Sequence, residues 1–264
     1  MTDQTLKYWF LFSGDQLLLE TKEDTYSIPC CVSAPAGLSA ESSFLCCGTL
    51  DGIPCMTGSF SATEKITPSY IPIGLRASFD LLPIRQHRLA GRAYQLYYWD
   101  RHSQYCPQCG KPVHIAEEYM KKCTACTYEI YPVITPAVLV LVQREDRVLL
   151  VRAHNFKGTF HSLVAGFLEV GESLEECVAR EVKEETGLSI HNIRYFGSQS
   201  WPYPSGVMIG FTATYIHGNI TLQTEELSSG RFYTADELPE LPGKISLARQ
   251  MIDWWIEAQQ TGNQ

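Results

Sequence analysis

The chain has 264 residues, enough for two modest domains or for one domain with an appendage. Its 45% hydrophobic and 19% charged residues exclude a collagen-like, coiled-coil or disordered chain. The formal net charge of -8 argues against a large basic surface for long nucleic acid. A phosphorylated ligand stays compatible with this charge, because acidic residues reach phosphate through divalent cations.

The sequence lacks the signals of a membrane or exported protein. No apolar run approaches the ~20 residues that cross a bilayer. Acidic residues near the start, with no basic segment before them, argue against a signal peptide. We therefore expect a cytoplasmic protein without a membrane partner. In that reducing compartment the ten cysteines predict metal binding and buried thiols rather than disulfides.

Three regions follow one another along the chain. Residues 1–103 mix short apolar runs with Gly, Pro and Ser, which predicts a small β-rich N-terminal domain with a helix only toward its end. Residues 104–130 are a cysteine-rich insert. Residues 131–258 predict one domain of mixed α/β (α+β) class, with helices packed on a mixed sheet. No pattern in residues 1–75 predicts a function.

The elements of the last region can be predicted one by one. It opens with a strand, PAVLVLVQ, and a charged turn before LLVRA, which predicts a hairpin. Two further strands are expected near IRYFGSQSW and VMIGFTATYI. The final SLARQMIDWWIEAQQ places Leu247, Met251, Ile252 and Trp255 at helical spacing, so we expect a C-terminal helix.

The cysteine-rich insert carries two CxxC pairs separated by thirteen residues: Cys106, Cys109, Cys123 and Cys126. This spacing predicts one structural Zn²⁺ in a zinc ribbon, because a closed shell of four thiolates leaves no position for substrate. A redox dithiol and a metal-free remnant are the alternatives. We interpret His114, between the pairs, as a surface residue. Zinc ribbons also occur in proteins that bind nucleic acid, but the acidic net charge weakens that interpretation.

An acidic helix is the most informative prediction. Ser173 and Glu176 form a capping box, and Gly187 is suited to end the helix, so it should span residues 174–186. At helical spacing, one stripe facing the sheet contains Leu174, Cys177, Val178 and Val182. The opposite face contains Glu175, Ala179 and Lys183.

Three carboxylates of this helix lie where apolar residues are expected. Glu181 and Glu185 fall within the buried stripe, and Glu184 falls at its edge. Such carboxylates repel one another, and burial raises their pKa values unless cations compensate. Mg²⁺ and Mn²⁺ prefer oxygen ligands of this kind. A solvated acidic face is the alternative, but it leaves the position of these residues unexplained.

The segment around this helix has the pattern G-x5-E-x7-R-E-U-x-E-E-x-G-U, where U is a bulky aliphatic residue. The residues that match are Gly166, Glu172, Arg180, Glu181, Val182, Glu184, Glu185, Gly187 and Leu188. The pattern resembles the Nudix box without a departure. The resemblance implies a Nudix α/β/α sandwich and a metal-dependent hydrolase of nucleoside-diphosphate compounds.

The same resemblance implies roles for individual residues. Glu181, Glu184 and Glu185 would be catalytic and would coordinate two or three Mg²⁺ or Mn²⁺ ions, with the Ala165 carbonyl as a further ligand. Glu226 matches another metal ligand of the family, with its neighbour Glu225 as the competing assignment. The remaining motif residues would be structural: Gly166, Glu172, Arg180 and Gly187. An ion pair between Glu172 and Arg180 is expected, and the identity of the general base stays open.

A proline-rich aromatic segment follows the motif. Prolines on both sides of an aromatic residue hold the chain extended, so the segment could offer a flat face to a nucleobase. A proline-broken edge strand is the alternative. The segment resembles the SQPWPFPxS signature of NADH pyrophosphatases, also described as NAD-capped RNA hydrolases. The implied substrate-binding residues are Gln199, Ser200, Trp201, Pro202, Tyr203, Pro204, Ser205 and Gly206.

Two residues of this segment depart from the signature. Tyr203 replaces Phe and keeps an aromatic face, whereas Ser200 replaces Pro and relaxes the backbone. The resemblance also implies substrate contacts outside the segment: Arg76, Glu118, Tyr131, Phe167 and Ala248. Of these, the two aromatic residues would stack on adenine.

The predicted reaction is hydrolysis of NADH or NAD⁺ to AMP and the nicotinamide mononucleotide. The same bond chemistry would remove a 5′ NAD cap from RNA. The alternatives are a Nudix hydrolase of another nucleoside diphosphate, such as ADP-ribose or a diadenosine polyphosphate, and a non-catalytic nucleotide sensor. The subfamily resemblance also implies a homodimer.

Overall fold

The computed structural model describes residues 5–35, 44–61, 67–155 and 158–262. It divides into two compact units. Unit 1 comprises Met1–Val133 with Pro202–Ser205, and unit 2 comprises Ile134–Trp201 with Gly206–Gln264. Among the described residues, no helix combines the length and apolar character needed to span a membrane.

Unit 1 contains a seven-stranded sheet and one long helix. Its elements in chain order are β1 (Lys7–Ser13), β2 (Gln16–Lys22), β3 (Thr25–Ser27), β4 (Cys30–Cys31), β5 (Leu45–Leu50), β6 (Ile53–Ser59), β7 (Tyr70–Gly74), a 3₁₀ turn (Ala77–Asp80) and α1 (Ile84–His102). The strand order is β3-β2-β1-β6-β5, with β4 paired to β1 and β7 paired to β2. β1 and β6 are parallel. The predicted β-rich region with a helix at its end is confirmed.

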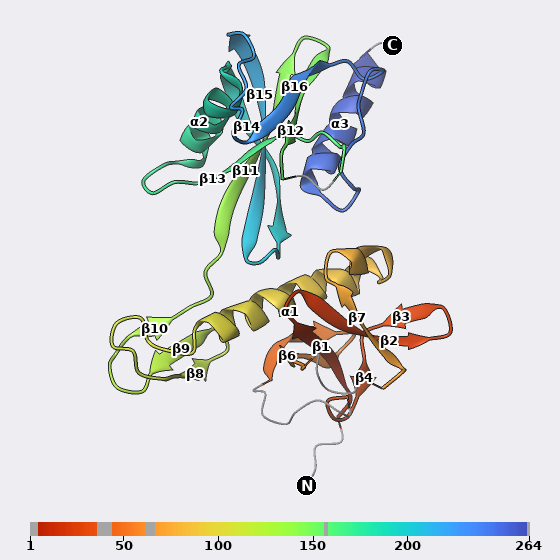
Figure 1. Ribbon diagram of the computed structural model, residues 1–264, viewed down its shortest axis with the longest axis vertical. Coiled ribbons are helices and arrows are strands. Elements are labelled where there is room, and N and C mark those ends of the chain that lie inside the picture. The colour runs from red at the N-terminus through yellow and green to blue at the C-terminus, as the bar shows by residue number, and fades with distance from the viewer. Residues whose placement is uncertain (1–4, 36–43, 62–66, 156–157, 263–264) are drawn as a thin grey trace. The chain divides into compact units, whose positions relative to one another are not determined.

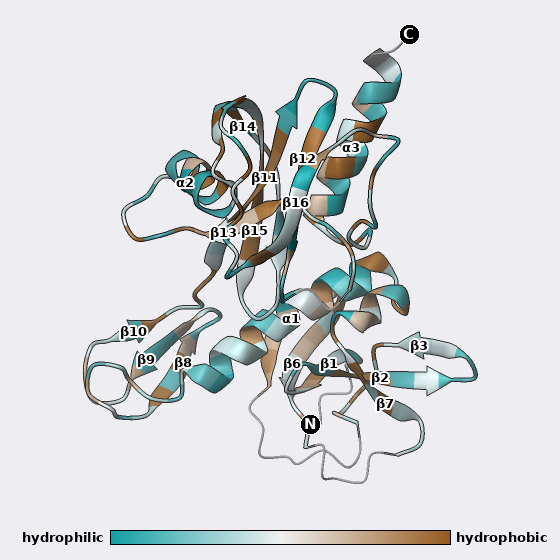
Figure 2. Ribbon diagram, turned by 45° about the horizontal axis from the view of Figure 1, so that its top comes forward, coloured by the Kyte–Doolittle hydropathy of each residue, from teal (hydrophilic) through white to brown (hydrophobic). Residues whose placement is uncertain are grey.

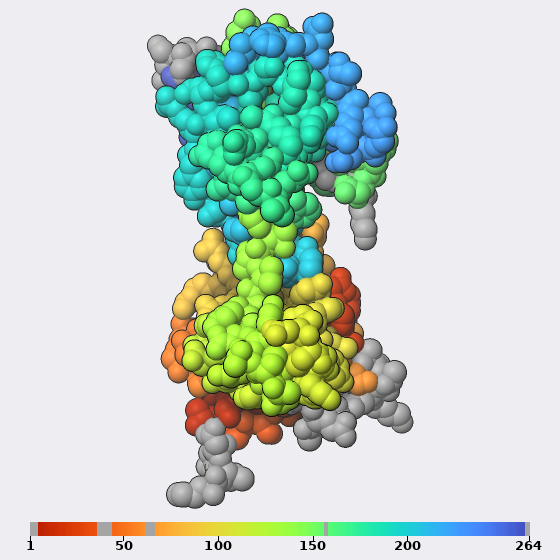
Figure 3. Space-filling model, turned by 90° about the vertical axis from the view of Figure 1, so that its left-hand side faces the viewer, coloured from red at the N-terminus to blue at the C-terminus, as the bar shows by residue number. Residues whose placement is uncertain are grey.

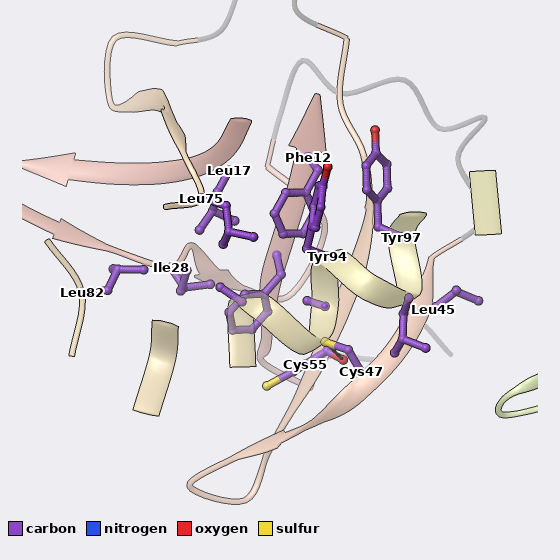
Figure 4. Packing of buried hydrophobic residues seen from close by; sticks show 14 of the residues in the cluster. Phe12, Leu17, Ile28, Leu45, Cys47, Cys55, Leu75, Leu82, Tyr94 and Tyr97 are labelled. Carbon is purple, nitrogen blue, oxygen red and sulfur yellow. Dashed lines mark hydrogen bonds between the residues drawn. The ribbon is translucent and has the colours of Figure 1, made fainter. Parts of the chain in front are cut away.

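The core of unit 1 lies between the sheet and α1. Side chains of β1 alternate between the two faces of the sheet, so Phe10 and Phe12 belong to the core beneath α1, whereas Trp9 and Leu11 belong to a smaller cluster on the other face. Phe12 contacts two aromatic rings of α1, Tyr94 at 5.1 Å and Tyr97 at 5.3 Å between ring centroids (Figure 4). Aromatic burial of this kind fixes α1 on the sheet.

A small three-stranded sheet follows α1 in the same unit. Its strands are β8 (Val113–Glu117), β9 (Met120–Cys123) and β10 (Glu129–Ile130), in the order β10-β9-β8. Lys121 of β9 is buried, and its ammonium group binds the Asp100 carboxylate at 2.7 Å and the Asp100 and Ser103 carbonyls at the end of α1. In Figure 3 the yellow end of α1 and the yellow-green small sheet form one continuous surface.

Unit 2 contains a six-stranded mixed sheet and two helices. Its elements are β11 (Thr135–Arg144), β12 (Arg147–Ala153), β13 (Val164–Phe167), α2 (Leu174–Thr186), β14 (Ser189–Trp201), β15 (Gly206–His217), β16 (Leu227–Tyr233) and α3 (Leu247–Gly262). The strand order is β14-β15-β11-β12-β16, with β13 paired to β11 (Figure 1). β11 is antiparallel to β12 and parallel to β15. The predicted hairpin, the two later strands and the C-terminal helix are confirmed.

The two helices of unit 2 cover opposite faces of its sheet. In β11, Val138 and Val140 belong to the core that contains α2, whereas Leu139 and Leu141 belong to the core that contains α3. In Figure 2 the brown, hydrophobic residues of unit 2 gather on the central strands and on α3. Trp255 of α3 is fully buried. The α/β/α sandwich predicted from the sequence is confirmed.

Unit 1 repeats the strand pairing of unit 2. β1, β2, β4, β5, β6 and β7 have the same neighbours and directions as β11, β12, β13, β14, β15 and β16. A helix follows β7 in unit 1, after a 3₁₀ turn, and another follows β16 in unit 2. The sequence between β4 and β5, where α2 lies in unit 2, contains a single carboxylate residue, Glu41. The sequence patterns did not predict this repeat.

Candidate functional site

α2 owes its exact bounds to local capping chemistry. The Ser173 hydroxyl accepts a hydrogen bond from the Glu176 amide at 3.2 Å, and the Ser173 amide donates to the Glu176 carboxylate at 2.8 Å. At the other end, Gly187 has a φ of 73°, a left-handed conformation that favours glycine. The helix spans Leu174–Thr186, as predicted.

The burial of α2 also follows the predicted stripe. Cys177, Val178 and Val182 are fully buried against the sheet. Glu185 is only 4% exposed, Glu181 is half-buried, and Glu184 at the edge of the stripe is exposed. Two carboxylates therefore occupy positions that a purely structural helix would fill with apolar side chains.

Arg180 holds the start of α2 together with the preceding loop. Its guanidinium makes a bidentate ion pair with Glu172, at 2.5 and 2.9 Å, and donates to the Phe167 carbonyl at 3.0 Å. Hydrogen bonds from Arg180 lower the pKa of Glu172 to about 2. The guanidinium also donates to Glu181 at 2.9 Å and Glu184 at 3.0 Å. Arg180 thus orients two of the three motif carboxylates.

Gly166 of β13 lies directly beneath a motif carboxylate. A methyl group added at Gly166 would lie 1.8 Å from the Glu181 side-chain carboxyl carbon. No side chain fits there unless Glu181 moves away. The glycine of the motif is therefore required by the close approach of the Glu181 carboxylate to the β13 backbone. Ala165, the predicted carbonyl ligand, is the preceding residue of the same strand.

Within the described residues, Arg180 pairs with Glu181, but no ion pair reaches Glu185. Burial, together with the charges of Glu181 and Glu226, raises the pKa of Glu185 to about 8. One Glu185 carboxylate oxygen is buried without a hydrogen-bond partner. Burial also raises the pKa of Glu181, against the influence of Arg180, with Glu184 and Glu226 adding repulsion. This excess of negative charge fits divalent cations, which are hard acceptors for carboxylate oxygens.

Glu226 faces this carboxylate cluster from the loop before β16. Its carbonyl accepts a hydrogen bond from the His154 amide at 2.8 Å, and its carboxylate accepts one from the Gln223 side chain at 3.2 Å. Glu226 influences the pKa of both Glu181 and Glu185. The Glu226 charge, and not that of Glu225, acts on both carboxyls within the described residues. The structure therefore places Glu226, rather than its neighbour, beside α2.

The aromatic segment Gln199–Gly206, which includes the end of β14 and the start of β15, is divided between the two units. Gln199 lies in unit 2, where its side-chain amide donates to the Ile245 carbonyl at 2.7 Å and its oxygen accepts from the Leu247 amide at 2.6 Å. It thus caps the start of α3. Four of the predicted segment residues lie in unit 2: Gln199, Ser200, Trp201 and Gly206.

The remaining residues of that segment, Pro202–Ser205, belong to unit 1. Pro202 packs so closely on α1 that a methyl group at Gly91 would lie 2.8 Å from its ring. The Tyr203 ring packs against the unit 1 core and lies 4.4 Å from the Arg76 guanidinium. Arg76 therefore occupies one face of this ring. The sequence did not predict this contact between the two side chains.

The other predicted substrate contacts differ in exposure. In unit 2, the Phe167 ring is 64% exposed, whereas Ala248 is buried in α3. In unit 1, the Tyr131 ring is 54% exposed and its hydroxyl donates to Glu129 at 2.9 Å. The Glu118 carboxylate accepts a short hydrogen bond from the Tyr119 hydroxyl. Phe167 and Tyr131 thus present the exposed aromatic faces that stacking requires.

The four predicted zinc ligands come together in the small sheet of unit 1. The sulfur atoms of Cys106, Cys109, Cys123 and Cys126 lie within 4.8 Å of one another. Three of the sulfur pairs are 3.4 to 3.7 Å apart, close to the roughly 3.8 Å expected for tetrahedral zinc with Zn–S bonds of about 2.3 Å. Amide groups of Ala125 and Cys126 donate to the Cys123 sulfur. The donor set fits a structural zinc ion, and His114 is exposed outside it.

Comparisons with known proteins place these features in a family. The NUDIX domain family matches residues 133–255, and the family described as "NADH pyrophosphatase-like rudimentary NUDIX domain" matches residues 6–99. A protein of Pseudomonas putida (strain W619) named NAD-capped RNA hydrolase NudC is 38% identical over 215 residues, which cover 79% of this chain and 76% of that protein. The chain belongs to the Nudix family. The resemblance predicted from the Nudix box is confirmed.

Further relatives differ in how much of their length is matched. A protein of the same name from Pseudomonas aeruginosa (strain LESB58) is 41% identical over 172 residues, which cover 65% of this chain and 62% of that relative. The chain therefore matches less than two thirds of that relative's length. A solved structure, a NUDIX hydrolase from Nitrosomonas europaea, is 24% identical with a TM-score of 0.52, and the match covers 60% of this chain and 93% of that protein. The likeness to this solved structure supports the Nudix fold.

The family match also explains the repeat of strand pairing in unit 1. The description of residues 6–99 as a rudimentary NUDIX domain agrees with the strand pairing that unit 1 shares with unit 2, and the sequence between β4 and β5 has a single carboxylate residue. Sequence patterns predicted a β-rich domain here but not its likeness to unit 2, because the pairing among distant strands carries no local signal.

Proposed function

We propose that this Nudix chain hydrolyses the pyrophosphate bond of NADH or NAD⁺, releasing AMP and the nicotinamide mononucleotide, and that it removes NAD caps from RNA by the same reaction. The observation that carries the proposal is the cluster formed by Glu181, Glu185 and Glu226. Burial and mutual repulsion raise the pKa values of the two helix carboxyls, and Arg180 alone does not offset them. Carboxyl groups whose ionised form is destabilised in this way are stabilised by bound cations.

The residues that would hold Mg²⁺ or Mn²⁺ are Glu181, Glu184, Glu185 and Glu226, with the Ala165 carbonyl. When bound, two or three such ions neutralise the diphosphate and acidify a coordinated water. The chain's own contribution is to position the carboxylates: Arg180 orients Glu181 and Glu184, and Gly166 leaves space for Glu181. One glutamate of α2 or of a nearby loop accepts the proton of the attacking water.

The substrate assignment rests on the relatives and on exposed rings. The relatives that match most of the chain are named NAD-capped RNA hydrolase. Phe167 and Tyr131 offer faces on which adenine can stack. The further proposed substrate-binding residues are Arg76, Glu118, Ala248 and Gln199–Gly206. Of these, Gln199 would act indirectly, because its side chain holds the start of α3.

Two further features complete the proposal. One Zn²⁺ held by the four cysteines stabilises the small sheet of unit 1, a segment too short to bury a core of its own. The protein acts as a homodimer, a state that light scattering of the purified protein would establish.

The test is a substrate panel of NADH, NAD⁺, ADP-ribose and NAD-capped RNA, with and without Mg²⁺ or Mn²⁺. We expect metal-dependent release of AMP and reduced nicotinamide mononucleotide from NADH, and of 5′-monophosphate RNA from capped RNA. Faster cleavage of ADP-ribose than of any NAD compound would contradict the substrate assignment.

Glutamine variants at two positions separate the roles of the carboxylates. If Glu185 is a metal ligand, Glu185→Gln weakens the activation by Mg²⁺, whereas a general base at Glu184 would make Glu184→Gln slow at every Mg²⁺ concentration. Unchanged turnover in both variants, with the protein folded, would rule out a catalytic α2.

A further inference from the structure

A basic cluster lies in unit 2 outside the carboxylate site. We define the β16 basic cluster as Arg152, His161, Ser229 and Arg231. Arg152 of β12 pairs with Ser229 of β16, and Leu150 pairs with Arg231. Because Leu150 faces the core under α3, strand alternation places Arg152, Ser229 and Arg231 on that same face of the sheet.

The side chains of this cluster contact one another or a shared neighbour. The His161 ring nitrogen Nε2 lies 3.0 Å from the Ser229 hydroxyl. The Arg231 guanidinium lies 4.3 Å from the centroid of the Tyr233 ring, and the His161 and Tyr233 rings meet edge to face with centroids 5.9 Å apart. Arg152 donates one hydrogen bond to the Gly158 carbonyl at 3.1 Å. Aromatic stacking and these hydrogen bonds hold the three basic groups in place.

The two arginines of the cluster are not neutralised by ion pairs with the part of the chain that the structure describes. Among the described residues, neither Arg152 nor Arg231 takes part in an ion pair. The Arg152 Nε atom is buried without a hydrogen-bond partner. The neighbouring Glu240 carboxylate accepts a short hydrogen bond from the Thr159 hydroxyl. Burial and the charges of both arginines lower the pKa of His161, as expected where positive charge is in excess.

The cluster lies close to the carboxylate site along the chain. Ser229 follows Glu226 by three residues, about 10 Å of extended strand. β16 is an edge strand, so a ligand can pass around it from one face of the sheet to the other. A flexible anionic chain leaving the carboxylate site therefore meets two guanidinium groups, which match the geometry of phosphate oxygens.

We propose that the β16 basic cluster binds a backbone phosphate of a single-stranded RNA, downstream of the position where the pyrophosphate is cleaved. The proposal rests on the proposed function for its location, since it takes Glu226 to mark the cleavage site. Arg231, which is exposed, would contact a phosphate oxygen directly, and Arg152 would add its positive charge from the partly buried side of the cluster. Ser229 and His161 would add hydrogen bonds. The contact is to phosphate, so it carries no base preference.

The test measures binding rather than turnover. A fluorescent, 5′-monophosphorylated single-stranded RNA of about 10 nucleotides is titrated with the full chain in the absence of divalent metal, at several salt concentrations. Arg231→Gln should weaken binding about 3- to 10-fold. It should also reduce the slope of log affinity against log salt by about 0.7, the value for one lost contact to a single strand. Arg231 is exposed, so this variant is expected to fold.

Arg147→Gln is the matched control. Arg147 is an exposed arginine at the other end of β12, and its loss changes the net charge equally. It should leave binding and the salt slope unchanged. Equal weakening by both variants would reduce the effect to net charge and overturn the proposal. Full competition by inorganic phosphate, with no dependence on RNA length, would also overturn it by showing a site for a free anion.

The binding assay separates this proposal from the proposed function. RNA binding that depends on Arg231, in a protein that hydrolyses no NAD compound, would refute the proposed function and support the phosphate site. Hydrolysis of NAD-capped RNA, together with RNA binding that does not depend on Arg231, would support the proposed function and refute the phosphate site.

Discussion

Replacing Glu185 with glutamine should stabilise the metal-free protein, and the gain should grow with pH. The Glu185 carboxyl is 4% exposed and its pKa is raised from 4.5 to about 8. In the unfolded chain the carboxyl ionises near 4.5, whereas in the folded chain it retains its proton until about pH 8. A carboxyl with a raised folded-state pKa therefore costs stability as the pH rises from 4.5 to about 8.

The size of this effect follows from the pKa. A shift from 4.5 to about 8 corresponds to roughly 4–5 kcal/mol above pH 8 and to about 3 kcal/mol at pH 7. Glutamine resembles the protonated carboxyl and does not ionise, so Glu185→Gln removes this cost. For a domain of this size, 3 kcal/mol corresponds to roughly 6–12 °C in Tm.

The assay is thermal unfolding of wild type and variant at pH 5 and at pH 8.5, with zinc retained and Mg²⁺ omitted. The two proteins should have similar Tm values at pH 5, and the variant should be the more stable at pH 8.5. Mg²⁺ should then raise the Tm of wild type and have little effect on the variant, because bound metal stabilises only the folded state that it binds. Glu175→Gln, on the exposed face of α2, is the control and should show neither effect. A Tm difference between wild type and Glu185→Gln that is the same at both pH values would refute this reasoning.

Three further predictions follow from single contacts. Gly166→Ala should lower kcat at least 100-fold with little loss of Tm, because its methyl group displaces the Glu181 carboxylate; steady-state kinetics with NADH test this, and near-normal kcat would contradict it. Lys121→Met should destabilise unit 1 by about 3 kcal/mol in urea unfolding, since it leaves Asp100 without its buried partner; unchanged stability would contradict the assigned role of the lysine. Cys109→Ser should release zinc to a colorimetric chelator while an unrelated thiol variant, Cys46→Ser, does not; equal zinc content in both variants would contradict the site.

Local chemistry made part of this structure predictable. The bounds of α2 depend on Ser173, Glu176 and Gly187, whose capping interactions involve residues at most four apart. Helical periodicity then placed Glu185 in the buried stripe, because the same stripe holds Val178 and Val182. The four zinc ligands were predictable for the same reason, since CxxC spacing fixes their local geometry.

Contacts between distant segments were not predictable. The choice of Glu226 over Glu225 depends on how the loop before β16 approaches α2, which no spacing in the sequence reports. The side chain of Gln199 holds the start of α3, forty-eight residues away, and Tyr203 packs beneath Arg76. The repeat of strand pairing in unit 1 was missed because it is a property of topology and leaves no motif in the sequence.

The central claim is that the carboxylate cluster of α2 and Glu226 carries metal-dependent cleavage of a pyrophosphate bond. The most direct measurement is single-turnover hydrolysis of NADH by wild type and by Glu185→Gln across a Mg²⁺ titration, with circular dichroism to establish that both are folded. We expect no AMP without metal, rapid AMP release by wild type with Mg²⁺, and a rate at least 100-fold lower in the variant. AMP release that is equal in the two proteins, or that proceeds at the full rate without a divalent metal, would contradict it.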